Sequence, residues 1–149
     1  MNKDYLSIYN HAKSIVDINL PLFTNLSNLS AVLNELDNIN WCGFYIVKDD
    51  ALYLGPFQGE VACSKIPFNK GICGRAYTNK ETVIIDNVLI DPDHIACSSA
   101  SRSEIVTPIL VNNVVVALID IDSPIFNRFN NEDKELLESI SILISNLFK

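Results

Sequence analysis

EIVTPILVNNVVVALIDID, residues 104–122, contains two runs of β-branched and other apolar residues on either side of Asn112-Asn113. Asparagine tolerates the positive φ angles of a tight hairpin turn, and each run has the length of a strand. The stretch therefore predicts an antiparallel hairpin of strands 104–111 and 114–122.

Outside this hairpin, the chain alternates between strand and helix patterns. Aromatic and β-branched residues predict further strands at 42–48, 51–55, 58–64 and 81–88. Apolar residues at helical spacing predict helices at 4–18, 25–38 and 131–148, with a short glycine-flanked helix at 68–78. The polar segment 89–103 is expected to be a long loop, and loops of this length are more often functional than idle. Helices at both ends of the chain around a mainly antiparallel sheet indicate the α+β class.

Composition excludes several classes of protein. The 149 residues contain no repeat or linker and predict a single domain, 1–149. A net charge of −7 would repel a phosphate backbone, so nucleic-acid binding is not expected. No apolar run is long enough for a membrane span, and the start MNKDYLSIYN lacks the apolar core of a signal peptide. A cytoplasmic protein is expected.

The four cysteines are the least ordinary part of the composition: Cys42, Cys63, Cys73 and Cys97. A chain with ample apolar residues and no signal peptide has no need of a disulfide framework. No pair has the close spacing of zinc-knuckle ligands, so no structural metal site is expected. Two interpretations remain for each cysteine, namely a buried thiol acting as a small apolar residue or a reactive thiol.

Cys97 has the most reactive setting, because it lies in the 89–103 loop among serines and five residues before Arg102. Hydroxyls and cations lower a thiol pKa, but an ordinary loop thiol fits the pattern equally well. A cysteine oxidised to a sulfenic acid needs a second thiol with which to condense. Cys63 and Cys73 are the candidates, although Cys63 fits a core-facing strand position as well.

Three acids form a second candidate group. Asp120 and Asp122 alternate at the end of a strand and therefore point to one face. If residues paired across the Asn112-Asn113 turn have numbers that sum to about 225, Glu104 lies opposite Ile121, between the two aspartates. Converging carboxylates attract an ammonium group or retain a proton. The alternative is a solvated strand end.

These residues occur in blocks that resemble the free methionine-(R)-sulfoxide reductases, which are single-domain enzymes of the GAF fold. The resemblance extends from about residue 20 to the last helix, and its blocks are NWCGFY at 40–45, GPFQGEVAC at 55–63, FNKGICGRA at 68–76, DPDHIACSSASRSEIVTPI at 91–109 and IDIDSP at 119–124. It implies a GAF-like fold, in which the N- and C-terminal helices pack on one side of the sheet. Loops and a short helix would form a pocket on the other side.

The resemblance also implies a role for each candidate residue. Cys97 matches the nucleophile that attacks the sulfoxide sulfur, Cys63 the resolving thiol that closes a disulfide with it, and Cys73 a second resolving thiol. The carboxylates that grip the free amino acid and assist proton delivery match Glu104, Asp120 and Asp122. The aromatic residues that receive the methylsulfinyl group match Trp41 and Tyr45. Cys42 departs from the family, which has an apolar residue there, and no assigned role depends on it.

The expected activity is therefore reduction of free L-methionine (R)-S-oxide, with thioredoxin as the external reductant and no bound cofactor or metal. A homodimer is a further possibility, because GAF domains often pair through their end helices. The alternative function is a non-catalytic GAF module that senses a small molecule and regulates a partner. Sensor modules usually belong to longer chains and have no need of three cysteines around a pocket, which favours the enzyme.

Overall fold

The sheet at the centre of the fold has its strands in the order β3-β2-β1-β6-β5-β4, with every neighbouring pair antiparallel. This computed structural model describes residues 1–95, 97 and 99–149. The strands are β1 (Trp41–Val47), β2 (Ala51–Gln58), β3 (Lys65–Pro67), β4 (Val83–Ile85), β5 (Ser103–Val111) and β6 (Val114–Ser123). The α-helices are α1 (Lys3–Ile15), α2 (Leu22–Leu33), α3 (Gly71–Asn79) and α4 (Asn131–Ile144), and the 3-10 helices are η1 (Val88–Ile90) and η2 (Ser145–Phe148). The expected α+β class is confirmed.

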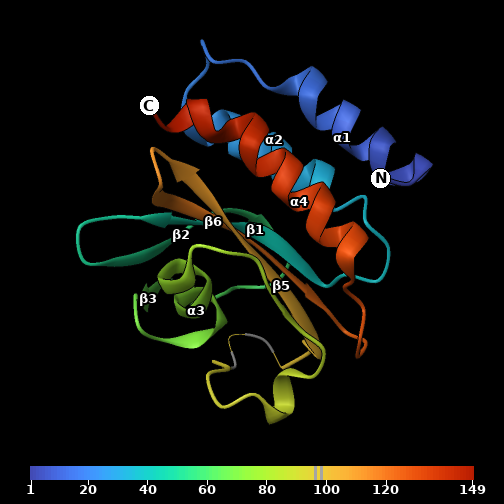
Figure 1. The fold of residues 1–149 in the computed structure, drawn as a ribbon, viewed down its shortest axis with the longest axis vertical. Helices are drawn as coiled ribbons and strands as arrows, with labels where there is room; N and C mark the ends of the chain where they lie inside the picture. Colours follow the sequence, from blue (N-terminus) through green and yellow to red (C-terminus); the bar gives the residue numbers. More distant parts are fainter. Residues whose placement is uncertain (96, 98) are drawn as a thin grey trace.

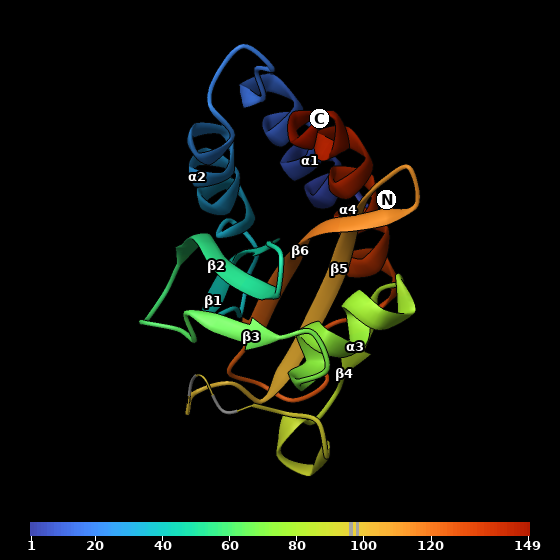
Figure 2. The same ribbon diagram turned by 90° about the vertical axis from the view of Figure 1, so that its left-hand side faces the viewer.

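Helices cover the two faces of the sheet unequally. The helices α1, α2 and α4 lie together on one face, whereas α3 lies with the loops on the other (Figure 1). Figure 2 shows the same separation from the side. Asn130 begins α4 with a reciprocal capping box to Asp133, which satisfies backbone donors that the first turn leaves free. None of the described helices is long and apolar enough to cross a membrane.

Each face of the sheet has its own apolar core. The helix-side core holds the stripes that the sequence pattern placed on the helices, including Leu26, Leu33, Leu136 and Ile140, together with Phe44 of β1 and Ile119 of β6. The pocket-side core is smaller and includes Trp41, Tyr45, Leu52, Ile66, Val106 and Leu118. Successive residues of β1 and β6 alternate between these two cores, as the two-residue period of a strand requires.

The hairpin of β5 and β6 differs from its predicted register. Asn112 and Asn113 have φ of 51° and 63°, as a tight turn between twisted strands demands. The first pairs after the turn follow the predicted sum, but an irregularity follows, at which Leu110 pairs with Val115 and Ile109 with Ala117. One residue of β6 is therefore unpaired, and the remaining pairs shift by one.

This β-bulge decides where Glu104 points. Glu104 pairs with Asp122, so the predicted partner Ile121 is wrong. Directly opposed residues of an antiparallel pair share a face of the sheet, and Ile121 belongs to the helix-side core. The shift of one residue therefore places Glu104 on the same face as Asp120 and Asp122.

Other predicted boundaries change as well. The expected strand at 58–64 is absent, because β2 extends to Gln58 and Gly59 then turns the chain with a φ of 137°. Val61 is 89% exposed, so its alternation with Cys63 had no structural meaning. The predicted strand 81–88 shortens to β4, and α2 begins earlier than predicted, directly after Pro21.

Candidate active site

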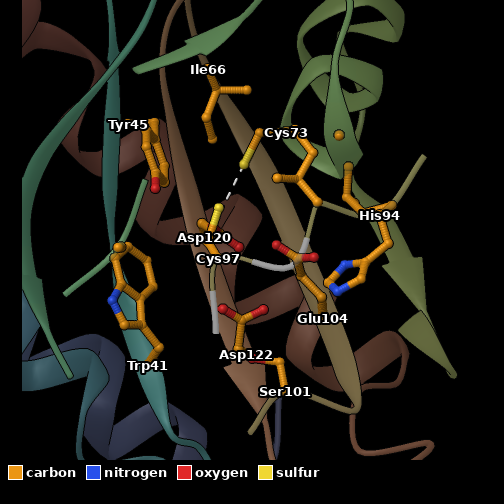
Figure 3. A pocket seen from close by; sticks show the side chains of 14 residues that line it. Trp41, Tyr45, Ile66, Cys73, His94, Cys97, Ser101, Glu104, Asp120 and Asp122 are labelled. Atoms are coloured by element: carbon orange, nitrogen blue, oxygen red, sulfur yellow. Dashed lines mark hydrogen bonds between the residues drawn. The ribbon is translucent and has the colours of Figure 1, made fainter. Parts of the chain in front are cut away.

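A pocket opens on the face of the sheet that α1, α2 and α4 leave uncovered. About 510 Å³ of space lies between its walls and in its mouth, where it is open to solvent. Its walls come from β1, β3, β5, β6, α3 and the segments before β3 and before β5. The aromatic rings of Trp41 and Tyr45 lie on one side and His94 on the other, with the carboxylates between them (Figure 3).

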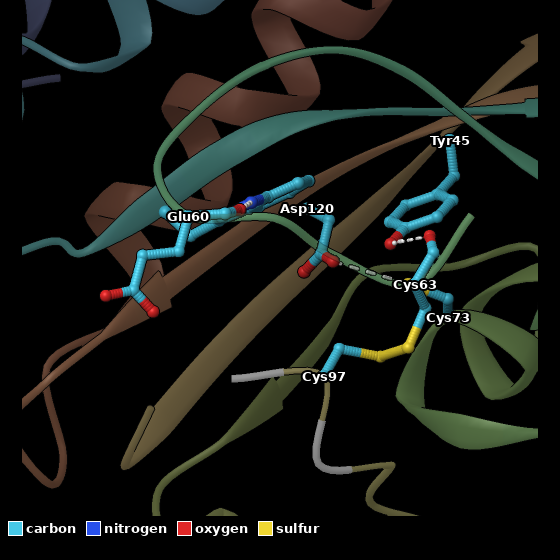
Figure 4. Close-up of a disulfide and its surroundings, with 7 residues drawn as sticks. Tyr45, Glu60, Cys63, Cys73, Cys97 and Asp120 are labelled. Carbon is cyan, nitrogen blue, oxygen red and sulfur yellow. Dashed lines mark hydrogen bonds between the residues drawn. A yellow bond between two sulfur atoms is a disulfide. The ribbon is translucent and has the colours of Figure 1, made fainter. Parts of the chain in front are cut away.

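Cys63 and Cys97 form a disulfide at the edge of this pocket (Figure 4). Their Cα atoms are 5.5 Å apart, within the range that a disulfide requires, although they are separated by 34 positions in the sequence. The hydroxyl of Tyr45 donates a hydrogen bond of 2.9 Å to the carbonyl of Cys63. A pocket side chain thus holds the backbone at one half of the disulfide.

The other two cysteines are free and lie on opposite faces of the sheet. Cys73, in α3, is 4% exposed and donates a hydrogen bond of 3.6 Å to Oδ2 of Asp120. Burial raises the pKa of the Cys73 thiol well above its ordinary value, and the negative charges of Asp120 and Glu104 raise it further. Cys42 belongs to the helix-side core, where it donates to the carbonyl of Ser30, and burial raises its pKa to about 12. Both thiols are protonated at neutral pH.

Glu104, Asp120 and Asp122 converge on the pocket floor, as the sequence predicted for the two aspartates. Burial raises the pKa of Glu104 well above its usual range, and the charges of Asp120 and Asp122 raise it further. Burial likewise raises the pKa of Asp122, with Asp120 adding to the effect. Burial also raises the pKa of Asp120, but hydrogen bonds from Glu104 and Cys73 to its carboxylate act in the opposite direction. Burial and mutual repulsion thus raise the pKa of all three carboxyl groups, which favours retention of a proton in the cluster.

Trp41 and Tyr45 form an aromatic wall in which the ring centroids are 6.0 Å apart. Phe57 also stacks on Trp41, with ring centroids 5.3 Å apart, and the indole nitrogen donates a hydrogen bond to the carbonyl of Glu60. Gly59 permits this arrangement, because a Cβ there would lie 2.6 Å from the indole ring. This wall of aromatic rings lines the same pocket as the three carboxyl groups.

Three further residues belong to the site although the sequence did not point to them. His94 and Ser101 line the pocket, and burial lowers the pKa of His94, so its imidazole is neutral at pH 7. Arg75, in α3, forms ion pairs with Asp91 at 2.6 Å and Asp93 at 2.7 Å. It therefore ties the helix that carries Cys73 to the segment that leads to Cys97. The only sign of this role in the sequence was the position of Arg75, directly after Gly71-Ile72-Cys73-Gly74.

Known proteins share this fold and much of this sequence over most of the chain. The GAF domain family model matches residues 22–147. The free methionine-R-sulfoxide reductase of Escherichia coli is 47% identical over 116 residues, which are 77% of this chain and 70% of that protein. The structure of fRMsr of Staphylococcus aureus in its reduced form has a TM-score of 0.93 at 41% identity, covering 99% of this chain and 97% of that one. The free methionine-R-sulfoxide reductase of Neisseria meningitidis, solved in complex with its substrate, has a TM-score of 0.90 at 38% identity, covering 97% of this chain and 87% of that one. The chain therefore belongs to the GAF domain family and, within it, to the free methionine-R-sulfoxide reductases.

Proposed function

We propose that this protein reduces free L-methionine (R)-S-oxide to L-methionine, with Cys97 as the nucleophile and Cys63 as the resolving thiol. The observation that carries the proposal is the Cys63–Cys97 disulfide at the edge of a pocket floored by three carboxyl groups. A sulfoxide reductase needs both a thiol pair that forms a disulfide and an acid that protonates the sulfoxide oxygen.

The reaction balances with the groups that the pocket supplies. In the reduced protein the Cys97 thiolate attacks the sulfoxide sulfur while a carboxyl group donates a proton to the oxygen. The oxygen is transferred to Cys97 as a sulfenic acid, and methionine leaves. Cys63 then attacks the sulfur of Cys97, the S–S bond forms, the S–O bond breaks, and the oxygen leaves as water. We assign the proton donor to Glu104, because burial and both aspartates favour its protonated form.

The charge of the pocket explains a preference for the free amino acid. The described lining residues include three acids, Glu104, Asp120 and Asp122, and no lysine or arginine. A ligand with a free ammonium group offsets this negative charge, and a methionine sulfoxide within a peptide has no such group. The aromatic wall of Trp41 and Tyr45 then receives the methylsulfinyl end of the substrate.

Recycling requires two electrons and two protons from an external dithiol, for which we propose thioredoxin. Cys73 would act as a second resolving thiol if the disulfide migrates during this exchange. A cytoplasmic location agrees with the need to reduce the disulfide after each turnover. A homodimer formed through the end helices belongs to the same set of proposals.

A coupled assay tests the activity. Reduced protein is mixed with thioredoxin, its reductase, NADPH and racemic methionine sulfoxide, and NADPH loss is followed. We expect consumption to stop at half of the racemate, to vanish in Cys97→Ser, and to persist in the matched control Cys42→Ser. No consumption by folded, reduced wild-type protein would refute the proposal. Calorimetric binding without turnover would instead favour the sensor module.

A further inference from the structure

Three side chains from distant parts of the chain meet at the base of the pocket. Cys73 comes from α3, Glu104 from the start of β5 and Asp120 from the end of β6. The Cys73 sulfur and one carboxylate oxygen from each acid lie within 4.8 Å of one another, and all three residues are buried. The disulfide of Cys63 and Cys97 leaves this group intact, since none of its members is one of the bonded cysteines.

The spacing fits the coordination of a small metal ion. A tetrahedral zinc ion with a Zn–S bond of about 2.3 Å and Zn–O bonds of about 2.0 Å requires a sulfur–oxygen separation of roughly 3.5 Å. Sγ of Cys73 and Oδ2 of Asp120 are 3.6 Å apart. These two donors therefore already have the separation that such an ion would require.

One oxygen at the same place has no hydrogen-bond partner among the described residues, so in the substrate-free protein it is available to a ligand. Asp120 is only 6% exposed, and its buried Oδ1 atom accepts no hydrogen bond from any described residue. A buried acceptor without a partner is costly, and here it lies next to a second carboxyl group, that of Glu104. A cation held by both oxygens of the Asp120 carboxylate, Oδ2 next to Cys73 and Oδ1, would give Oδ1 a partner and offset the charge of both acids.

We propose that the protein in its disulfide form binds one zinc-like divalent cation through Cys73 Sγ and carboxylate oxygens of Glu104 and Asp120. Water completes the coordination, and the Cys73 thiol releases its proton to solvent when the metal–sulfur bond forms. A thiolate with two carboxylates selects zinc or cobalt over magnesium and calcium, which prefer oxygen ligands alone.

Such binding would inhibit the enzyme. The ion would neutralise the acids that we assign to the substrate and to proton delivery, and it would withhold Cys73 from thiol exchange. This consequence rests on the proposed function, whereas the binding itself does not. The experiment below measures binding without substrate, so that failure of one proposal is distinguished from failure of the other.

The test is titration of the oxidised, substrate-free protein with CoCl₂. Cys42 and Cys73 are its only free thiols, so a thiolate-to-cobalt charge-transfer band in the near ultraviolet reports on one of these two. We expect a band that saturates at one equivalent and disappears when ZnCl₂ is added. It should persist in Cys42→Ser and be absent in Cys73→Ser.

Asp120→Asn provides a second variant that retains the thiol. It should weaken cobalt binding at least about tenfold, because a neutral amide is a poorer ligand than a carboxylate. Circular dichroism establishes that each variant is folded. The proposal is overturned if the wild-type protein gives no charge-transfer band, if the band persists in Cys73→Ser, or if folded Asp120→Asn binds cobalt as tightly as the wild type.

Discussion

Reduction of the Cys63–Cys97 disulfide is expected to cost the protein a substantial part of its stability. The bond closes a loop with a sequence separation of 34, which includes α3 and β4. In the unfolded chain this closure removes conformations that become available again once the bond is reduced. The working thiol form is therefore the less stable of the two redox states.

The loop length sets the magnitude. Chain-entropy arguments give about 3 kcal/mol for a 15-residue loop and about 4.7 kcal/mol for a 100-residue loop. For a separation of 34 the same relation gives a loss of about 4 kcal/mol in the free energy of unfolding. With a urea dependence of about 2 kcal/mol per molar, the unfolding midpoint should fall by about 2 M urea on reduction.

The chain supplies its own probe, since Trp41 is the single tryptophan and lies in the pocket wall. Urea unfolding is followed by its fluorescence, with and without a phosphine reductant. The control is Cys63→Ser, which cannot form the bond. Its urea midpoint should equal that of the reduced wild-type protein and should not change when the reductant is added. A shift below about 0.5 M urea in the wild type, or an equal shift in Cys63→Ser, would refute the reasoning.

Three further predictions concern catalysis and the pocket wall. Cys63→Ser should still form one methionine per protein in a quenched single-turnover experiment but lose most thioredoxin-driven cycling, and cycling at the wild-type rate would transfer the resolving role to Cys73. Glu104 has a raised pKa and must be protonated to act as the acid, so activity should fall as pH rises through that pKa. Glu104→Gln should lower kcat by about 10²–10⁴ and abolish this pH dependence. An unchanged pH profile in the variant would assign proton donation to another group. Gly59→Ala should destabilise the protein by about 1–3 kcal/mol in urea unfolding and shift the fluorescence emission of Trp41. Both the φ of 137° and the nearby indole ring disfavour a Cβ at this position. An unaltered emission spectrum together with wild-type stability would contradict this prediction.

The parts of the fold that the sequence predicted correctly are those with local causes. The Asn112-Asn113 turn and the apolar stripe of α4 follow from φ preferences and helical spacing, which require no knowledge of the rest of the chain. The face shared by Asp120 and Asp122 follows from the two-residue period of a strand. These features survive unchanged in the structure.

The features that the sequence missed depend on contacts between distant residues. Nothing in the run Val115-Val116-Ala117 marks a bulge, because all three residues suit a strand. The ion pairs of Arg75 and the approach of His94 to the pocket arise from a loop that the sequence shows only as polar. Charge and spacing in the sequence identified the candidate residues, but only the folded structure shows how these residues lie relative to one another.

The bulge in β6 has a consequence for the lengths that this hairpin can take. Deleting Val116 would convert the bulge into a regular ladder, because Leu110–Val115 and Ile109–Ala117 would become consecutive pairs. The acids would keep their face, so a loss of one residue here is tolerated. An inserted residue has no such outlet and would turn Asp120 and Asp122 into the helix-side core. Length variation in β6 should therefore be one-sided, with loss of the one unpaired residue permitted and an added residue between the bulge and Asp120 excluded.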